Sequence, residues 1–230
     1  MVQNHLFQVL TMVTMEPPSN ISSEQISIEK LKILKELQID KESLIFWQYN
    51  WYQQERNVNE SSRVETFVAM KVSLNNWRFK NLPIYLKTGK SLNEKKTIVI
   101  IEFKEIPNIF YRKYGEIERN RIIIEIQPDD RISIQFNLKK KNSHNQMNSV
   151  KSEFKKIWKD DNAYDRLLLD CMYWSKLLFT NWDILRQSWE IVDWIVNCKN
   201  DCPILYSYEK WSIWPIQWNL LLEKDWRKWY

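Results

Sequence analysis

Glycine is almost absent from this chain of 230 residues, which contains only Gly89 and Gly115. At the usual frequency of about 7%, a globular chain of this length would carry about 16 glycines. Dinucleotide-binding units need closely spaced glycines in the turn between a strand and a helix. No G-x-G-x-x-G segment is present, and replacing every tryptophan by glycine would not create one in that setting. The sequence therefore excludes a Rossmann-type unit within these residues.

Cysteine and long apolar runs are scarce as well. The three cysteines, Cys171, Cys198 and Cys202, have neither CxxC spacing nor histidine-rich surroundings. We therefore predict no metal site and no disulfide framework, as is usual in a reducing cytoplasm. No segment reaches the roughly 18 apolar residues of a membrane span, and the first residues lack the basic start and cleavage motif of a secretion signal. A cytoplasmic protein without a membrane partner is expected.

The charges are nearly balanced. Lys and Arg number 34 against 29 Asp and Glu, which gives a formal net charge of +5. Apart from a short run at residues 139–141 these charges are dispersed, so nucleic-acid binding is not predicted. Arg166 and Asp170 lie four residues apart in a predicted helix and are expected to form a structural ion pair. With 44% hydrophobic residues, the chain can bury a sizeable core, and one domain over residues 1–230 is predicted.

The apolar pattern predicts helices at both ends of the chain and strands between them. A 3.6-residue period over 2–13, followed by two prolines, predicts a first helix that ends near residue 15. Ser22 or Ser23 can cap a second helix that runs to Leu37. From β-branched residues and polar turns, strands are predicted at 44–49, 66–74, 84–87, 97–103, 121–127, 132–138 and 150–154, and further helices at 163–173 and 183–197. This order is typical of an α+β fold with a large, mostly antiparallel sheet backed by helices.

His5 is one of only two histidines in the chain. It completes the polar triplet Gln3-Asn4-His5 ahead of an apolar stretch, so this turn is expected to border a polar cavity. An imidazole placed there can accept a proton near neutral pH. The alternative interpretation is a hydrogen-bonded histidine of the core.

Five blocks of sequence resemble the glucose-6-phosphate dehydrogenase family, in the family's order. They are QNHLFQ with MEPP within residues 3–18, ETFVAMK at 65–71, NWRF with PIYLKTGK within 76–90, IEIQPD at 124–129 and AYDRLLLD at 163–170. The family patterns are QNHLLQ with MEPP, ETFVALK, NWRW with PFYLRTGK, IRIQPDE and AYERLLLD. Any one block would be weak, but five in order across one chain are a specific signal.

The resemblance implies the carboxy-terminal half of an enzyme that oxidises glucose 6-phosphate to its lactone in the oxidative pentose phosphate pathway. By motif position, His5 is the expected catalytic base and Lys90 the expected contact for the sugar phosphate, while Lys95 and Gln127 are further substrate-side candidates. The hydride acceptor, NADP, is bound mainly by the family's amino-terminal domain, which has no counterpart in this chain. Glu125 stands where the family commonly has Arg, so no second, structural NADP is expected. The family's sheet mediates dimerisation, which implies a homodimer or a higher oligomer.

Two functional interpretations stay open. Without a cofactor domain the chain has no hydride acceptor, so this half-enzyme is expected to be inactive alone. The alternative is a non-catalytic module that binds sugar phosphate or pairs with dehydrogenase subunits. Coding sequence upstream of Met1 would distinguish them.

Tryptophan is as abundant as glycine is rare, with 13 residues. Against the family pattern, six stand where glycine is usual: Trp47, Trp51, Trp174, Trp211, Trp214 and Trp226. Where the backbone needs positive φ, an indole would cost about 1–2 kcal/mol. One hypothesis is that UGA codons, which the source reads as glycine, were translated here as tryptophan. The alternative is genuine tryptophans, tolerated on the surface or marking a sticky face.

Overall fold

The structure is a computed structural model that describes residues 1–104, 118–140, 147–155, 163–177, 179–201, 204–213, 215, 217–225 and 227. Its contacts divide the chain into two compact units, Met1–Asn93 with Asn162–Trp229, and Glu94–Asp161 with Tyr230. Each unit has a sheet of its own. That both units form one domain stays a prediction. Cys202, Trp214 and Trp226 lie outside the described residues.

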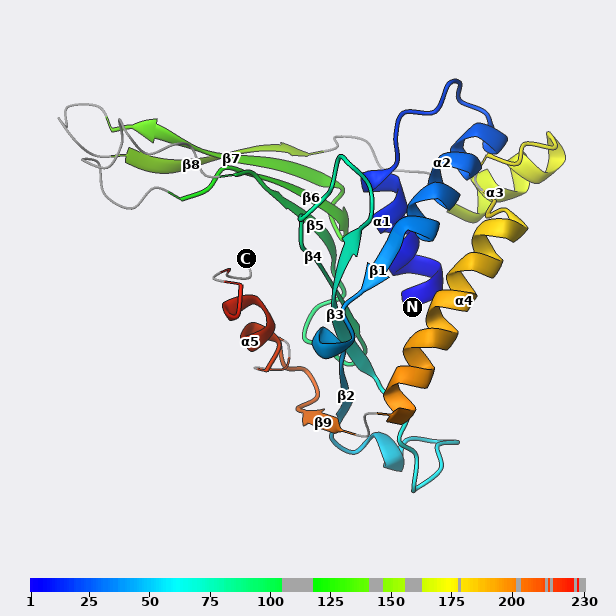
Figure 1. Cartoon of the computed structure of the whole chain (residues 1–230), viewed down its shortest axis with the longest axis vertical. Helices are drawn as coiled ribbons and strands as arrows, with labels where there is room; N and C mark the ends of the chain where they lie inside the picture. The colour runs from blue at the N-terminus through cyan, green and yellow to red at the C-terminus, as the bar shows by residue number, and fades with distance from the viewer. Residues whose placement is uncertain are drawn as a thin grey trace. The chain divides into compact units, whose positions relative to one another are not determined.

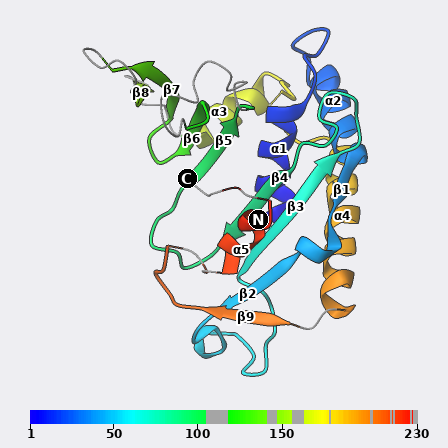
Figure 2. The same cartoon turned by 60° about the vertical axis from the view of Figure 1, so that its left-hand side comes forward.

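The first unit is a five-stranded sheet with helices on both of its faces (Figure 1). Its elements are the π-helix η1 (Val2–Leu6), α1 (Phe7–Thr14), α2 (Ser23–Glu36), β1 (Leu37–Ile39), the 3-10 helix η2 (Lys41–Ser43), β2 (Ile45–Tyr49), the 3-10 helix η3 (Tyr52–Gln54), β3 (Phe67–Leu74), β4 (Ile84–Gly89), α3 (Ala163–Met172), α4 (Trp182–Asp201), β9 (Leu205–Tyr208) and α5 (Gln217–Glu223). On one side of β3, β1 and β2 pair with successive parts of the strand, and β4 pairs along the other side, all antiparallel. Strand β9 pairs parallel with β2 (Figure 2).

Two local signals set the first helices. Helix α1 ends before Met15, whose backbone is already extended, with φ −64° and ψ 153°. Two prolines follow at positions 17 and 18. Ser22 caps α2, because its Oγ accepts a hydrogen bond of 3.3 Å from the backbone N–H of Gln25. Both predicted helix ends are thereby confirmed, whereas the opening π-helical turn was not predicted.

The core of this unit lies on both faces of β3, whose side chains alternate between two clusters. Val68, Met70 and Val72 belong to the cluster covered by α1, α2 and α4. Phe67 and Ala69 belong to the cluster covered by α5. Because both faces are buried, β3 is apolar at nearly every position.

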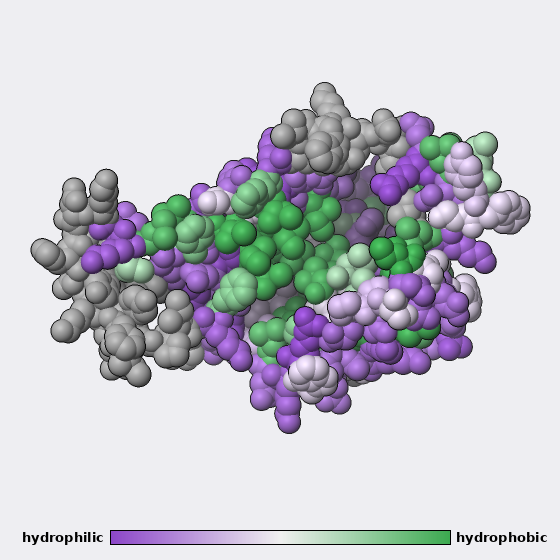
Figure 3. Space-filling view, turned by 90° about the horizontal axis from the view of Figure 1, so that it is seen from above, coloured by the Kyte–Doolittle hydropathy of each residue, from purple (hydrophilic) through white to green (hydrophobic). Residues whose placement is uncertain are grey.

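The second unit is a four-stranded antiparallel sheet. Its strands are β5 (Thr97–Glu102), β6 (Arg121–Gln127), β7 (Arg131–Lys139) and β8 (Met147–Lys155), in that order across the sheet. Ile132, Ile134, Leu138 and Phe154 lie on one face of this sheet and are all exposed. Figure 3 shows hydrophobic side chains gathered near the centre of the face seen from above.

The opposite face of the same sheet is charged. Arg121, Glu125 and Ser133 are buried there, with exposed fractions of 3%, 6% and 2%. Arg121 forms ion pairs with Glu102 and Glu118. The usual polarity of a half-buried sheet is therefore reversed in this unit.

The predicted α+β class, with antiparallel strands and helices that back them, is confirmed, and all seven predicted strands are present within a few residues. The strands form two sheets rather than one. Strands β1 and β9 and helix α5 were not predicted. Arg166 and Asp170 are both among the described residues of α3, and no ion pair joins them. An arginine that precedes its acidic partner is the weaker order on a helix, and exposed pairs of this kind gain little.

Candidate functional site

His5 lies in the π-helix η1, where its backbone N–H donates a 3.0 Å hydrogen bond to the carbonyl of Met1. Its side chain is exposed, whereas that of Gln3, on the same turn, is buried. Helix η1 packs against α1, α4 and β4. The interpretation of His5 as a core histidine is therefore wrong, and its role as a base stays a prediction.

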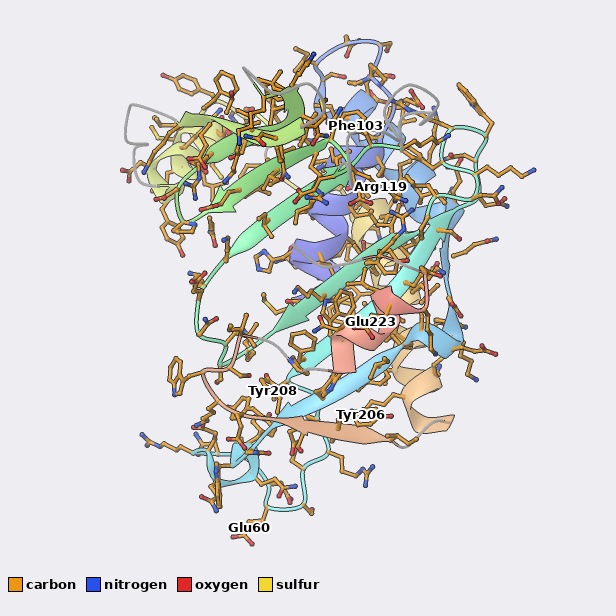
Figure 4. All side chains as sticks on the ribbon, turned by 90° about the vertical axis from the view of Figure 1, so that its left-hand side faces the viewer. Glu60, Phe103, Arg119, Tyr206, Tyr208 and Glu223 are labelled. Atoms are coloured by element: carbon orange, nitrogen blue, oxygen red, sulfur yellow. The ribbon has the colours of Figure 1, made fainter. Side chains whose placement is uncertain are left out.

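Lys90 directly follows β4, the strand that η1 contacts, and its backbone is held on both sides. The N–H of Lys90 donates to the carbonyl of Thr66 at 2.9 Å. The carbonyl of Lys90 accepts a 2.7 Å hydrogen bond from the hydroxyl of Tyr208, on β9 beside β2 (Figure 4). The same hydroxyl lies 3.1 Å from Thr66 Oγ1. The Lys90 side chain is exposed, so an anchored backbone presents its ammonium group to solvent.

Glycine is required at position 89 by the close approach of a ring. The final residue of β4 faces Phe67 across the sheet, and a Cβ on Gly89 would lie 2.2 Å from Phe67 Cδ2. Phe67 cannot easily retreat, because it packs edge-on against Trp47 and Tyr208, with ring centroids 5.2 and 5.8 Å away. A side chain at 89 would therefore disturb the residues that hold Lys90.

A turn at residues 209–212 fixes the segment that follows Lys90. The N–H of Ser212 donates to the carbonyl of Glu209 at 3.2 Å, which closes the turn. The N–H of Trp211 donates to the carbonyl of Ser91 at 2.8 Å, and the N–H of Asn93 donates to the carbonyl of Ser212 at 3.1 Å. The loop after Lys90 is thus tied to the end of β9 at two points.

A cation–carboxylate pair supports the same turn. Lys210 Nζ lies 2.5 Å from Glu55 Oε1 and 5.0 Å from the centroid of the Tyr49 ring. The hydrogen bond from Lys210 holds the pKa of Glu55 below its usual value. Residues 49–55 and 91–93, both distant in sequence from β9, therefore meet at its end.

The inner side of β4 carries a half-buried lysine. Lys87 Nζ lies 5.5 Å from the centroid of the Trp218 ring of α5, and burial lowers the pKa of Lys87 to about 7. Nearby, the Tyr85 hydroxyl donates to the carboxylate of Asp225, which also pairs with Lys71 at 2.6 Å. Burial, followed by the hydrogen bond to Asp225, raises the pKa of Tyr85. No sequence pattern indicated this cluster, although Lys87 follows Leu86 within a predicted strand and therefore faces the other side of the sheet.

Lys95 and Gln127 lie in the second unit. Gln127 ends β6 and pairs with Thr97 at the start of β5, and Lys95 is two residues before Thr97. Both side chains are exposed. The structure thus brings His5 and Lys90 onto contacting elements of one unit, and Lys95 and Gln127 to one end of the sheet in the other.

Glu125, which stands where the resembled family commonly has arginine, is used inside the sheet. It stands directly across from Arg131 on β7, and Arg131 Nη2 lies 2.8 Å from Glu125 Oε2. The hydrogen bond to Glu125 and its negative charge raise the pKa of Arg131. The buried carboxylate is therefore neutralised by a cross-strand partner.

Within the described ranges, no three or more His, Cys, Asp or Glu side chains lie close enough together to hold a metal ion. Among the helices described, none combines the length and the apolar composition needed to cross a bilayer. Cys171 and Cys198 carry free thiols. The described strands and helices include no glycine-rich turn of the Rossmann type that could hold the phosphates of NADP.

Comparison with known proteins gives a consistent result. The family model for "Glucose-6-phosphate dehydrogenase, C-terminal domain" matches residues 1–230. Glucose-6-phosphate 1-dehydrogenase of Buchnera aphidicola is 37% identical over 260 residues, which cover all of this chain and 52% of that protein. The Bacillus subtilis enzyme is 33% identical, with coverage of 100% and 51%. The chain therefore spans about half the length of these relatives.

Solved structures show the same extent of similarity. A glucose-6-phosphate dehydrogenase in complex with its substrate glucose 6-phosphate matches with a TM-score of 0.90 and 27% identity, over all of this chain and 50% of that one. Glucose-6-phosphate 1-dehydrogenase from Mycobacterium avium matches with a TM-score of 0.86 and 29% identity, over 100% and 49%.

Proposed function

The chain belongs to the glucose-6-phosphate dehydrogenase family, matching its carboxy-terminal domain, and we propose on this ground that it binds glucose 6-phosphate and removes its proton while NADP accepts hydride. The observation that supports this most is the exposed His5 on a helical turn packed against β4, the strand that leads to Lys90. Acting in this way, the protein would belong to the oxidative pentose phosphate pathway of the cytoplasm.

In the proposed reaction the imidazole of His5 takes the proton of the C1 hydroxyl. The hydrogen on C1 leaves with its electron pair as hydride to the nicotinamide, and the C1–O bond becomes the carbonyl of 6-phosphoglucono-1,5-lactone. Lys90 supplies an ammonium for the phosphate dianion, a charge-assisted contact. Lys95 and Gln127 are the proposed further contacts to the sugar phosphate.

NADP is proposed to bind to the half of the relatives' length that this chain does not span. The described residues offer no phosphate-binding glycine turn. The proposal therefore assigns to this chain the sugar side of the reaction, and we expect the purified chain to form no NADPH by itself.

Binding can be tested with the two histidines as reporters. We expect glucose 6-phosphate to shift the imidazole resonance of His5, which a His144→Gln variant would assign, and glucose alone to cause no shift. Lys90→Ala is expected to weaken binding at least tenfold, whereas Lys80→Ala, at another exposed lysine, serves as the control. Binding that leaves the His5 resonance in place would contradict the proposal.

Catalysis is tested separately from binding. The chain is joined to the amino-terminal half of the Bacillus subtilis relative, and NADPH formation is followed by absorbance. Turnover that His5→Asn abolishes supports the dehydrogenase. Binding without turnover in the fusion would instead favour the non-catalytic sugar-phosphate module.

We further propose that the apolar face of β5–β8 pairs with a second copy of the chain. Its exposed side chains, Ile132, Ile134, Leu138 and Phe154, form a patch of the kind that marks an interface. Ile132→Lys with Phe154→Lys is expected to convert a dimer to a monomer in sedimentation, whereas Ile21→Lys, in a loop, leaves the dimer intact. A chain that is monomeric without any substitution would contradict this.

A further inference from the structure

Three tryptophans of this chain have positive φ angles. Trp51, Trp174 and Trp211 have φ of 71°, 55° and 63°. Among the described residues, the remaining non-glycine positions with positive φ carry small polar side chains: Asn57, Asn81, Ser91 and Asp130. Asn and Asp, and short polar side chains generally, tolerate this region, whereas a bulky residue there is an outlier.

Trp174 occupies the position that helices most often give to glycine. The N–H of Ser175 donates to the carbonyl of Asp170 at 2.8 Å, and the N–H of Trp174 donates to the carbonyl of Cys171 at 3.2 Å. These two bonds, with positive φ at 174, form the Schellman motif that ends α3. Glycine is the usual residue at this point because any Cβ there crowds the backbone.

Trp211 lies in a turn with the same requirement, and Trp51 also has a left-handed backbone. Trp211 is the third residue of the turn closed between Glu209 and Ser212, and positive φ at that position is the feature of a type II turn, which favours glycine. Trp51 precedes η3 with φ 71° and ψ 12°. Hydrogen-bonded turns thus set the left-handed region at positions 174 and 211, and Trp51 adopts it directly before η3.

Packing does not compensate the strain at these sites. The side chains of Trp51, Trp174 and Trp211 are 67%, 88% and 71% exposed. An indole that is mostly in solvent contributes little burial to offset an unfavourable backbone. At these three positions the backbone strain is therefore not offset by burial of the indole ring.

We infer that the natural protein carries glycine at positions 51, 174 and 211, encoded by UGA codons that the source reads as glycine and that were translated here as tryptophan. Glycine at 211 would let the turn that holds Ser91 and Asn93, next to Lys90, form without strain. The structure gives no such backbone reason at Trp47, which is fully buried in a strand with its Nε1 unpaired among the described residues.

The coding DNA and the native protein provide the first test. We expect UGA at codons 51, 174 and 211, and UGG at the codons for Trp77 and Trp189, which serve as controls within the same gene. Peptides of the native protein are expected to have the masses of glycine at the three positions. UGG at these codons, or tryptophan in the native peptides, would overturn the inference.

Stability provides an independent test on the recombinant chain. Trp51→Gly, Trp174→Gly and Trp211→Gly are each expected to raise the Tm, by about 2–4 °C. Trp189→Gly, at an exposed position within α4, is expected to lower it, because glycine weakens a helix interior. If the three variants lower the Tm as the control does, the inference fails. The result does not depend on whether the chain binds sugar phosphate.

Discussion

The hydroxyl of Tyr208 donates a 2.7 Å hydrogen bond to the carbonyl oxygen of Lys90, although the two residues are 118 positions apart. Burial raises the pKa of Tyr208, so this hydroxyl keeps its proton well above neutral pH. The last strand of the first unit thereby fixes the backbone of the proposed phosphate-binding lysine. Tyr208 is a positioning residue, since its contact is to the backbone of Lys90.

Tyr208→Phe tests this contact. Loss of one buried hydrogen bond is expected to lower the free energy of unfolding by about 1 kcal/mol and to weaken glucose 6-phosphate binding severalfold, measured by calorimetric titration. Tyr206→Phe, two residues earlier on the same strand (Figure 4), is the control and should change neither quantity. Equal effects of the two variants would remove the special role of Tyr208.

Gly89→Ala is expected to lower the free energy of unfolding by about 1–3 kcal/mol, because the added Cβ overlaps the Phe67 ring. Urea denaturation measures the loss. In a chain that already carries Phe67→Leu, Gly89→Ala should cost less than it does in the parent. This would identify the Phe67 ring as the obstacle. Purely additive losses would place the cause elsewhere.

Lys87→Met tests the pH dependence that burial creates. The unfolded chain keeps the Lys87 proton up to its ordinary pKa of 10.5, whereas the folded protein keeps it only to about 7. Between these values the unfolded state binds more protons, so the free energy of unfolding rises with pH. Below pH 7 Lys87 is charged in both the folded and the unfolded state, so its contribution to the free energy of unfolding no longer changes with pH.

Lys87→Met should therefore be more stable than the parent at neutral pH. Its free energy of unfolding should also rise less than that of the parent between neutral and alkaline pH. The Trp218 ring favours the ammonium, which narrows the pH range over which the free energy of unfolding rises. Urea midpoints across this range measure both effects, with Lys80→Met, at an exposed site, as the control. Parallel pH profiles for parent and Lys87→Met would contradict the expected titration.

Arg131→Gln would leave the buried carboxylate of Glu125 without its cation. We expect the free energy of unfolding to fall, by less than for a fully buried pair because the Arg131 side chain is 26% exposed. The double variant with Glu125→Gln should recover much of the loss. Arg186→Gln, which removes an exposed pair with Glu190, should cost less than about 0.5 kcal/mol.

The sequence predicted those parts of the fold that local signals determine. The period of the first segment, the Ser22 cap and the β-branched runs of β3 and β6 each specify an element without reference to the rest of the chain. By contrast, β9 has only four residues, LYSY, whose strand conformation depends on pairing with β2. The reversed polarity of the β5–β8 sheet was equally hidden, because alternation shows that two faces differ but not which one is buried.

For the candidate site, the motif blocks predicted His5 and Lys90, and η1, which carries His5, contacts β4, the strand that Lys90 follows; their roles stay predictions. Tyr208 could not be predicted, because no local pattern shows which distant carbonyl a tyrosine will reach. Lys87 was missed for a related reason. Its half-buried setting is created by α5, a helix that the apolar pattern did not reveal.

The parallel pairing of β9 with β2 also sets an order of assembly during biosynthesis. Residues 205–208 leave the ribosome long after residues 45–49, so one edge of β2 stays uncovered until β9 has been made. Only then can the hydroxyl of Tyr208 reach the carbonyl of Lys90. A message cut short ahead of codon 205 would yield a protein with most of its first sheet but without the tyrosine that fastens its proposed anion-binding lysine.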